Sequence, residues 1–235
     1  MMAKDISIIG KRKRIAVVGA GIGGLVSALK LANDGFEVTV FESSNYPGGK
    51  IRTIESSCGP VNIGPTVLTM LSVFQSLFEQ VGENIFDHLE LKEQEILARH
   101  WWSDGTEFDL LANKDDAFDE VKRVFGANSG KQYIKFCKST EGMFDCFEKP
   151  IMRSSSPAAL EILKEICNNP KIIPALIPFL TLEKYLKNKF SEPKLQQLFG
   201  RYSTYVGGSP LNSPALMALV WQAEARGVWT VKGGI

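Results

Sequence analysis

The sequence has few of the residues that bind metals or form disulfides. Its 235 residues include four cysteines and two histidines, and none of the cysteines forms a C-x-x-C pair. A structural zinc site needs four nitrogen or sulfur ligands at close spacing, and disulfide scaffolds are typical of much shorter secreted chains. We therefore predict no metal site and no disulfide framework. We expect reduced core residues at Cys58, Cys137, Cys146 and Cys167.

The sequence also lacks a strong net charge and a long apolar run. The formal net charge is +1, which gives no overall field for attracting nucleic acid. No segment reaches the ~18–20 apolar residues of a membrane span. The basic run Lys11–Arg14 before the apolar segment Ile15–Leu29 resembles a signal peptide, but the spacing of the glycines in that segment favours a nucleotide-binding turn. The basic run is expected to be a solvated lead-in to a first strand.

The N-terminal segment predicts a βαβ unit. Ile15–Val18 and Glu37–Phe41 are short apolar runs that indicate parallel strands, the first of them fully buried. Gly35 is expected just after the end of the intervening helix, as a residue that tolerates the left-handed conformation. Apolar residues recur at helical spacing between the strands, at Ile22, Leu25, Val26 and Leu29.

A glycine motif lies where the first strand meets this helix. Gly19, Gly21 and Gly24 fit the pattern G-x-G-x-x-G, and Gly23 lies in the same turn. In dinucleotide sites these glycines permit a tight turn, close approach of the backbone to a pyrophosphate, and close packing of helix on strand. Glu42 ends the second strand, at the distance where a carboxylate accepts hydrogen bonds from ribose hydroxyls. The combination predicts dinucleotide binding.

The residues after Glu42 indicate which dinucleotide. Gly48-Gly49-Lys50 and the following Ile51-Arg52-Thr53 resemble the Glu, spacer, Gly-Gly-Arg pattern of the flavin amine oxidase and carotenoid desaturase superfamily. This resemblance implies FAD, with Gly48, Gly49 and Lys50 around its phosphate and ribityl region. Lysine stands where arginine is common in amine oxidases, so a bidentate phosphate contact is lost while charge attraction remains.

A second segment resembles the Asp-x-Gly-Pro stretch that lies near the isoalloxazine ring in that superfamily. It runs from Asn62 through Gly64 and Pro65 to Thr66. The resemblance implies cofactor contacts from Gly64 and Thr66. Asparagine at position 62 replaces the usual aspartate, so a charge-dependent role is not implied here. The alternative for Gly64-Pro65 is a simple turn.

The resemblance to one family extends over almost the whole chain from Ile15. The segments that carry it resemble the bacterial phytoene desaturase family, and within that family the hydroxyneurosporene and methoxyneurosporene desaturases of purple phototrophic bacteria. They are Gly64–Met70, Ala98–Gly105, Phe199–Pro210 and Gly227–Ile235. This implies FAD-dependent desaturation of a carotenoid, such as a 1-hydroxy or 1-methoxy carotenoid, by a cytoplasmic protein peripheral to the photosynthetic inner membrane.

Several alternatives to this function stay open. Within the superfamily they are phytoene desaturase, carotenoid isomerase and another amine-oxidase-like oxidoreductase, and in another class a non-catalytic fragment or an interaction half. The sequence names no catalytic residue, because no Ser/His/Asp or Cys/His set is apparent and His88 and His100 are expected to be structural. A flavin enzyme needs no such set, because the cofactor performs the difficult step.

A composition change near residue 92 predicts two domains in an α/β fold. Residues 1–92 are expected to form the N-terminal part of a Rossmann-like FAD-binding domain with an incomplete parallel sheet. Residues 93–235 are expected to form a partial substrate domain, mostly helical, with a β-hairpin at Ser103-Asp104-Gly105. Ser156-Pro157 and Ser213-Pro214 each predict a helix start with proline at the first helical position.

The most apolar stretch of the chain is Ile172–Leu180. Lysines flank it, at Lys171, Lys184, Lys187 and Lys189. The pattern suits a peripheral contact with a bilayer surface, and a buried core segment is the alternative.

Members of the family are about twice as long as this chain, and their flavin domain is discontinuous. We therefore expect a fragment, a split gene product or a truncated reading frame, with a second chain carrying the C-terminal half as a possible partner. An unfinished sheet leaves apolar edges uncovered. We expect weak flavin retention and no activity from this chain alone.

Overall fold

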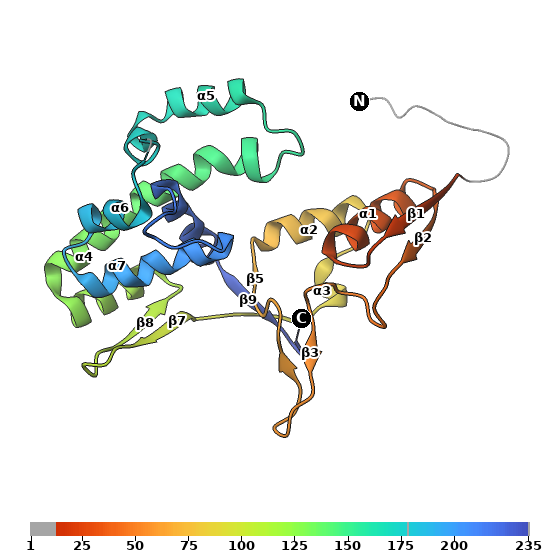
Figure 1. The fold of residues 1–235 in the computed structure, drawn as a ribbon, viewed down its shortest axis with the longest axis horizontal. Coiled ribbons are helices and arrows are strands. Elements are labelled where there is room, and N and C mark those ends of the chain that lie inside the picture. Colours follow the sequence, from red (N-terminus) through yellow and green to blue (C-terminus); the bar gives the residue numbers. More distant parts are fainter. Residues whose placement is uncertain (1–12, 178, 235) are drawn as a thin grey trace. The chain divides into compact units, whose positions relative to one another are not determined.

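The computed structural model describes residues 13–177 and 179–234, which divide into two compact units (Figure 1). The first unit runs to Lys92 and also contains the segment from Trp229 onward, and the second is Glu93–Val228. The units divide next to residue 92, and they differ from the predicted domains in the C-terminal segment, which lies with the first unit. The assignment of the units to flavin and substrate stays a prediction.

The first unit opens with the predicted βαβ element. Strand β1 (Arg14–Val18) leads to helix α1 (Ile22–Asn33) and strand β2 (Glu37–Phe41), and the two strands pair in parallel. Helix α1 ends as expected, because Asp34 caps it and Gly35 follows at φ 90°. The Rossmann-like α/β prediction is confirmed.

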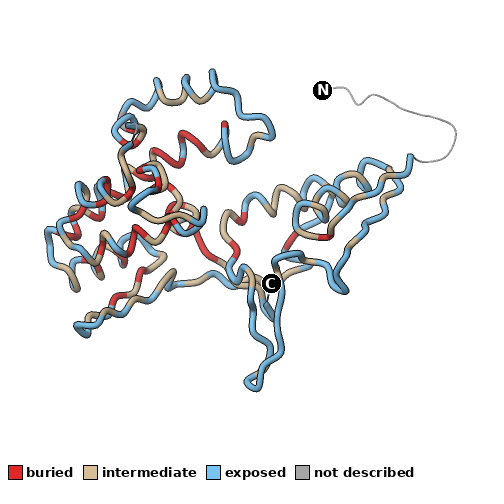
Figure 2. Tube along the Cα trace, viewed as in Figure 1, coloured by how far each residue is buried: buried red, intermediate tan, exposed pale blue. Residues whose placement is uncertain are grey.

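The prediction that β1 is fully buried is wrong. Its residues alternate between half-buried and exposed, and Val18 is 86% exposed. The described part of the chain gives this sheet only two strands, and α1 packs on it with no buried residue of its own. Figure 2 shows most of this region as exposed or intermediate. The cause is missing cover, because a parallel strand is buried only when neighbouring elements cover both its faces.

The rest of the first unit contains short strands and two helices. Strands β3 (Thr53–Ile54) and β4 (Val61–Asn62) form a small antiparallel ladder. A three-stranded sheet has the order β5–β9–β6, and a small apolar cluster packs beside it around Leu68, Leu71 and Ile85. The remaining bounds are β5 (Leu68–Thr69), α2 (Leu71–Gln80), α3 (Ile85–His88), β6 (Leu91–Glu93) and β9 (Val228–Val231).

The second unit begins with the predicted hairpin. Strands β7 (Ile96–Trp101) and β8 (Glu107–Leu111) are antiparallel, and Gly105 in the turn has φ 82°. Helix α4 (Lys114–Phe147) follows, capped by the side chain of Asn113 and interrupted at Gly126, where φ 87° and ψ 165° are not helical. The hairpin prediction is confirmed.

Helices around α4 complete the second unit. Its core is aromatic: Phe136 lies 4.5 Å from Phe199 and 5.0 Å from Phe190, measured between ring centroids. The bounds are η1 (Glu148–Met152), α5 (Ala159–Asn168), η2 (Pro170–Ala175), α6 (Leu182–Lys189), α7 (Pro193–Gly200), η3 (Arg201–Val206), η4 (Ala215–Val220) and α8 (Trp221–Ala225).

Two helix starts and two cysteines differ from expectation. Ala158 is the N-cap of α5, two residues beyond the predicted Ser156, and Pro214 is itself the N-cap of η4. Cys58 and Cys167 are exposed rather than buried in a core, although all four thiols are free.

Among residues 13–177 and 179–234, no helix is long and apolar enough to cross a membrane.

Candidate functional site: a glycine-lined cavity in the first unit

The first glycine turn leaves the N-terminal end of α1 open. Gly19 has φ 94°, and its N–H donates to the carbonyl of Phe41 at 2.7 Å. Gly21 is the N-cap of α1, so no side chain caps this end, and the first turn carries no acidic residue. Free N–H groups and the positive end of the helix dipole are therefore available to an anion.

The motif glycines differ in how much they need to be glycine. A Cβ on Gly24 would lie 1.9 Å from the carbonyl oxygen of Gly19, a distance that no side chain tolerates. A Cβ on Gly23 would meet nothing within 4 Å. Close packing of the helix start against the turn thus requires glycine at position 24 but not at position 23.

A second glycine turn meets the first. Gly48 has φ 119° and Gly49 has φ 63°, both in the region that favours glycine. The N–H of Gly48 donates to the carbonyl of Ala20 at 2.8 Å, and a Cβ on Gly49 would lie 3.0 Å from the Cα of Gly21. The two turns therefore form one wall of backbone atoms. Without side chains in the way, a bulky anion can approach this wall closely.

Gly64 packs against the backbone of the same segment. A Cβ at this position would lie 2.0 Å from the carbonyl oxygen of Lys50, and the adjacent Ile63 N–H donates to Arg52 at 2.9 Å. Glycine here supports the loop that carries Lys50. The predicted contacts of Gly64 and Thr66 with a flavin ring stay predictions.

Glu42 ties the end of β2 to the glycine turn. Its carboxylate accepts the N–H of Ala20 at 2.6 Å and that of Ser44 at 2.8 Å. These two backbone donors lower the pKa of Glu42 to about 2, so it is ionised at neutral pH. The carboxylate keeps lone pairs for further donors, as a ribose-binding role requires.

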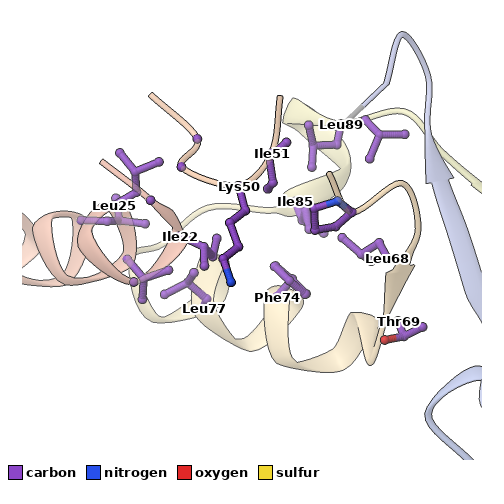
Figure 3. A pocket seen from close by; sticks show the side chains of 18 of the residues that line it. Ile22, Leu25, Lys50, Ile51, Leu68, Thr69, Phe74, Leu77, Ile85 and Leu89 are labelled. Atoms are coloured by element: carbon purple, nitrogen blue, oxygen red, sulfur yellow. The ribbon is translucent and has the colours of Figure 1, made fainter. Parts of the chain in front are cut away.

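A cavity of about 910 Å³ lies beside the two turns. Five of the ten predicted cofactor residues line the cavity: Gly21, Gly23, Gly48, Gly49 and Lys50. The other five do not line it: Gly19, Gly24, Glu42, Gly64 and Thr66. In Figure 3 the side chain of Lys50 extends past Ile22 of α1 toward α2, which carries Phe74 and Leu77. Lys50 is the one charged side chain among the described lining residues.

Most of the other lining residues were not nominated from the sequence. These residues are apolar, and they come from α1, from the region of α2 and α3, and from β9. Examples are Leu25, Phe74, Leu77, Ile85, Leu89 and Val231. A helix face with Phe74 and Phe78 has the same pattern whether it lines a cavity or fills a core, so sequence offered no signal. Val231 lines the cavity because the chain returns to the first unit after it has formed the second unit.

A buried polar cluster in the second unit was also missed. Glu224, 5% exposed, accepts hydrogen bonds from Arg201 at 2.6 Å, from Tyr202 at 2.7 Å and from the hydroxyl of Tyr205. Burial, reinforced by this carboxylate, raises the pKa of both tyrosines. The cluster lies partly in the segment Phe199–Pro210, which carried the family resemblance, but the role of Glu224 had no sequence signal.

His100 lies in the same unit and is half-buried. Its ring stacks on Trp102 with centroids 5.7 Å apart, and its Nε2 atom is buried without a hydrogen-bond partner. Burial, and then the charge of Arg201, lowers the pKa of His100. The described residues contain no group of three or more His, Cys, Asp or Glu side chains that could hold a metal ion.

The glycine-turn region matches a known domain family. Residues 17–82 match the model of the NAD(P)-binding Rossmann-like domain. Solved structures with a similar fold include a putrescine oxidase bound to putrescine (18% identity, TM-score 0.58, covering 95% of this chain and 46% of that one). Another is the cyclohexylamine oxidase of Brevibacterium oxydans (16% identity, TM-score 0.56, covering 94% and 46%). At this identity the likeness shows the fold alone.

Curated relatives are much more similar in sequence. The hydroxyneurosporene desaturase of Cereibacter sphaeroides is 44% identical over 94% of this chain and 45% of the relative. The protein of the same name in Rhodobacter capsulatus is 38% identical with the same coverage. A 1-hydroxycarotenoid 3,4-desaturase of a Flavobacterium is 31% identical over 95% of this chain and 46% of the relative. The predicted resemblance is confirmed, and the chain spans about half the length of these relatives.

Proposed function

We propose that this chain, a homologue of the hydroxyneurosporene desaturases, provides the FAD-binding part of a carotenoid desaturase. The observation that carries the proposal is the backbone wall formed by the two glycine turns at the uncapped start of α1, with Glu42 ionised beside it. The relatives named above, over nearly the whole chain, support the same activity.

The residues fit the parts of FAD. The turn from Gly19 to Gly24 and the turn at Gly48-Gly49 would hold the pyrophosphate through backbone N–H groups. Glu42 would accept hydrogen bonds from a ribose, and the ammonium of Lys50 would compensate phosphate charge. Apolar side chains dominate the rest of the cavity, which suits the flat ring systems of the cofactor.

When bound, FAD would supply the oxidising chemistry of this proposed reaction, in which the carotenoid loses a hydride from a carbon next to the polyene and a proton from the neighbouring carbon. The chain's contribution is to hold the cofactor in a fixed register and to keep water from an apolar site. The names of three relatives support a hydroxylated carotenoid as the substrate. An amine substrate is the second candidate, supported only by the fold of the amine oxidases.

A carotenoid substrate makes contact with a bilayer useful, and the second unit offers a surface for it. Phe179 is 98% exposed and has φ 68°, a costly backbone conformation for a phenylalanine, while Ile173 and Ile177 are about half exposed. The predicted core alternative holds for Ile172 and Ala175, which are buried. We assign Ile173, Ile177 and Phe179, here called the apolar tip, to the membrane contact.

The open faces of the first unit support the further proposal that another polypeptide segment completes its sheet. Val18, Ile22 and Phe41 are each more than half exposed, and among the described residues β1 pairs with one strand, β2. A further strand or helix of the kind present in the longer relatives would bury these side chains. The segment can belong to a longer chain or to a second one.

Two glycine substitutions test FAD binding. FAD titrated into the chain should show quenched flavin fluorescence and saturable binding. Gly24→Ala should weaken it at least about tenfold, because its Cβ would meet the Gly19 carbonyl at 1.9 Å. Gly142→Ala in α4, which has open space around its Cβ and does not line the cavity, is the control and should bind like the wild type. Equal binding by both variants would contradict the assignment.

Product analysis tests the reaction. The chain should be expressed together with the C-terminal half of a relative in a host that makes hydroxylated carotenoids. Chromatography should then show a product with one more double bond, and Gly24→Ala should abolish it. An unchanged carotenoid profile, with oxidation of an amine by the same preparation, would favour the second candidate.

A further inference from the structure

A cleft of about 540 Å³ lies in the second unit, where α4 packs against α5 and η2. It is separate from the glycine-lined cavity and from the Glu224 cluster. Its lining combines polar donors with an apolar wall, and it consists of Lys135, Lys138, Ser139, Gly142, Asn168, Asn169, Pro170 and Ile172. No carboxylate is among these described lining residues, which makes the cleft suitable for an anion.

The two lysines of the cleft form no ion pair with any acidic side chain that the structure describes. Lys135 and Lys138 are one turn apart on α4, so they lie on the same side of that helix. Both are exposed, and within the described residues neither has a carboxylate within 4.0 Å. Other lysines of this unit do: Lys114 pairs with Glu141 and Lys187 with Glu183. Two neighbouring ammonium groups without counter-charges repel each other, and a bound anion would relieve the repulsion.

A third cation lies near the same wall. The ammonium of Lys189 lies 4.9 Å from the ring centroid of Tyr185, and the hydroxyl of Tyr185 is 3.2 Å from that of Ser139. Ser139 lines the cleft, whereas Lys189 does not, so the ring of Tyr185 separates this third cation from the cleft wall. Serine hydroxyl and asparagine amide groups in the lining can donate hydrogen bonds to phosphate oxygens.

The cleft also leads directly to the apolar tip. Ile172, which is buried in the cleft wall, is followed in η2 by the exposed Ile173, and the exposed Ile177 and Phe179 come after this helix ends at Ala175. Positive charge beside exposed apolar side chains is the pattern of a protein that binds an anionic bilayer through headgroup and acyl region together.

We propose that this cleft binds the phosphate headgroup of an anionic phospholipid, with Lys135 and Lys138 as the principal contacts, while the apolar tip enters the acyl boundary. The inference rests on the proposed membrane contact and adds a specific lipid class to it. A free phosphate ion has the same chemistry, and the test separates the two sources.

Vesicle co-sedimentation of the full chain tests the cleft. The vesicles are pure phosphatidylcholine, or phosphatidylcholine with phosphatidylglycerol. The wild type should bind the anionic vesicles at least about tenfold more tightly. Lys135→Gln/Lys138→Gln should remove most of that preference, and binding to phosphatidylcholine should be unchanged. The control Lys122→Gln/Lys149→Gln removes two exposed lysines elsewhere in the unit and should keep the preference, with circular dichroism confirming that all variants are folded.

The outcomes are distinguishable. Loss of preference in both double variants, or in neither, would overturn the headgroup site, because net charge or another surface would then explain binding. Inorganic phosphate that binds the wild type but not Lys135→Gln/Lys138→Gln in calorimetry, together with no preference of the wild type for anionic vesicles, would show a free-phosphate site instead. Absence of binding to both vesicle types would overturn the membrane contact itself, whereas equal binding to both would overturn only the cleft. FAD titration of the same samples reports separately on the proposed cofactor function.

Discussion

The two compact units of this protein differ in how completely they bury their apolar residues. The second unit surrounds α4 with helices and buries large side chains from most of its elements, such as Phe108, Phe136, Leu186 and Phe199. In the described part of the first unit, the buried apolar residues are Ala20, Leu68, Leu71 and Ile85. Its longest helix, α1, has no buried residue.

The difference shows that the second unit is stabilised by its own core, whereas the first unit needs further polypeptide segments to cover its apolar faces. Burial of apolar surface contributes about 25 cal/mol per Å², so a unit with a closed core is stabilised by its own residues. The first unit instead leaves Val18, Ile22 and Phe41 in contact with solvent. Contiguous apolar exposure of this kind marks a binding surface. The glycine-lined cavity belongs to this less covered unit.

The largest expected effect is on the closed core. Phe136→Ala removes a fully buried ring that packs on Phe190, Phe199 and Trp221, and should lower the free energy of unfolding by about 3–5 kcal/mol. Urea denaturation followed by tryptophan fluorescence measures it. Ile134→Ala, 37% exposed on the same helix, is the control and should cost far less. Similar losses in both variants would show that the second unit is not as closely packed as described.

The next effect compares ion pairs from the two units. Glu224→Ala leaves Arg201 without its carboxylate partner and should destabilise the second unit by about 3 kcal/mol. Glu90→Ala breaks the pair with Lys232 in the first unit, where both side chains are at least 70% exposed. That loss should be below about 1 kcal/mol. Hydrogen exchange resolved by segment measures each unit, and comparable losses would refute the contrast in burial.

A glycine pair tests close backbone packing in the first unit. Gly64→Ala places a Cβ 2.0 Å from the Lys50 carbonyl oxygen, and should destabilise that unit by about 1–3 kcal/mol. Gly142→Ala in α4 meets nothing within 4 Å and should be neutral or stabilising, because alanine is the better helix former. Thermal unfolding of both variants provides the measurement. A neutral Gly64→Ala would mean that the loop relaxes freely.

The smallest expected effect is a pH dependence from His100. Its pKa in the folded chain lies below the ordinary 6.5, so the unfolded chain takes up a proton first as the pH falls. The stability contribution is complete above pH 6.5 and decreases as the pH falls below it. In His100→Gln, the free energy of unfolding should differ less between pH 7.5 and pH 5.5 than it does in the wild type. An unchanged slope in this variant would assign the pH dependence to other groups.

Much of the local structure followed from the residues alone. The βαβ unit and the hairpin at Gly105 were predictable, because apolar runs, helical spacing and turn residues act over a few neighbours. The helix starts near Ser156 and Ser213 were misplaced by one or two residues. Local capping preferences compete there with tertiary packing, and packing decided the boundary.

The cavity was only partly predictable. Its glycine wall could be predicted from the motifs at Gly19–Gly24 and Gly48–Gly49, because glycine permits backbone conformations and close contacts that other residues do not. Its apolar side was not predictable, because residues such as Phe74 and Leu77 have the pattern of any amphipathic helix.

By itself, the sequence determined the dinucleotide-type turns, the acidic residue after β2 and the similarity to carotenoid desaturases, since these depend on residue identity at fixed short spacing. Only the tertiary structure decided which faces are closed. It brought the strand β9, from the far end of the chain, beside β5 and β6, and it gathered Glu224 with Arg201 and Tyr205. The physical reason is that burial and long-range pairing depend on which distant elements meet, and no local pattern records that.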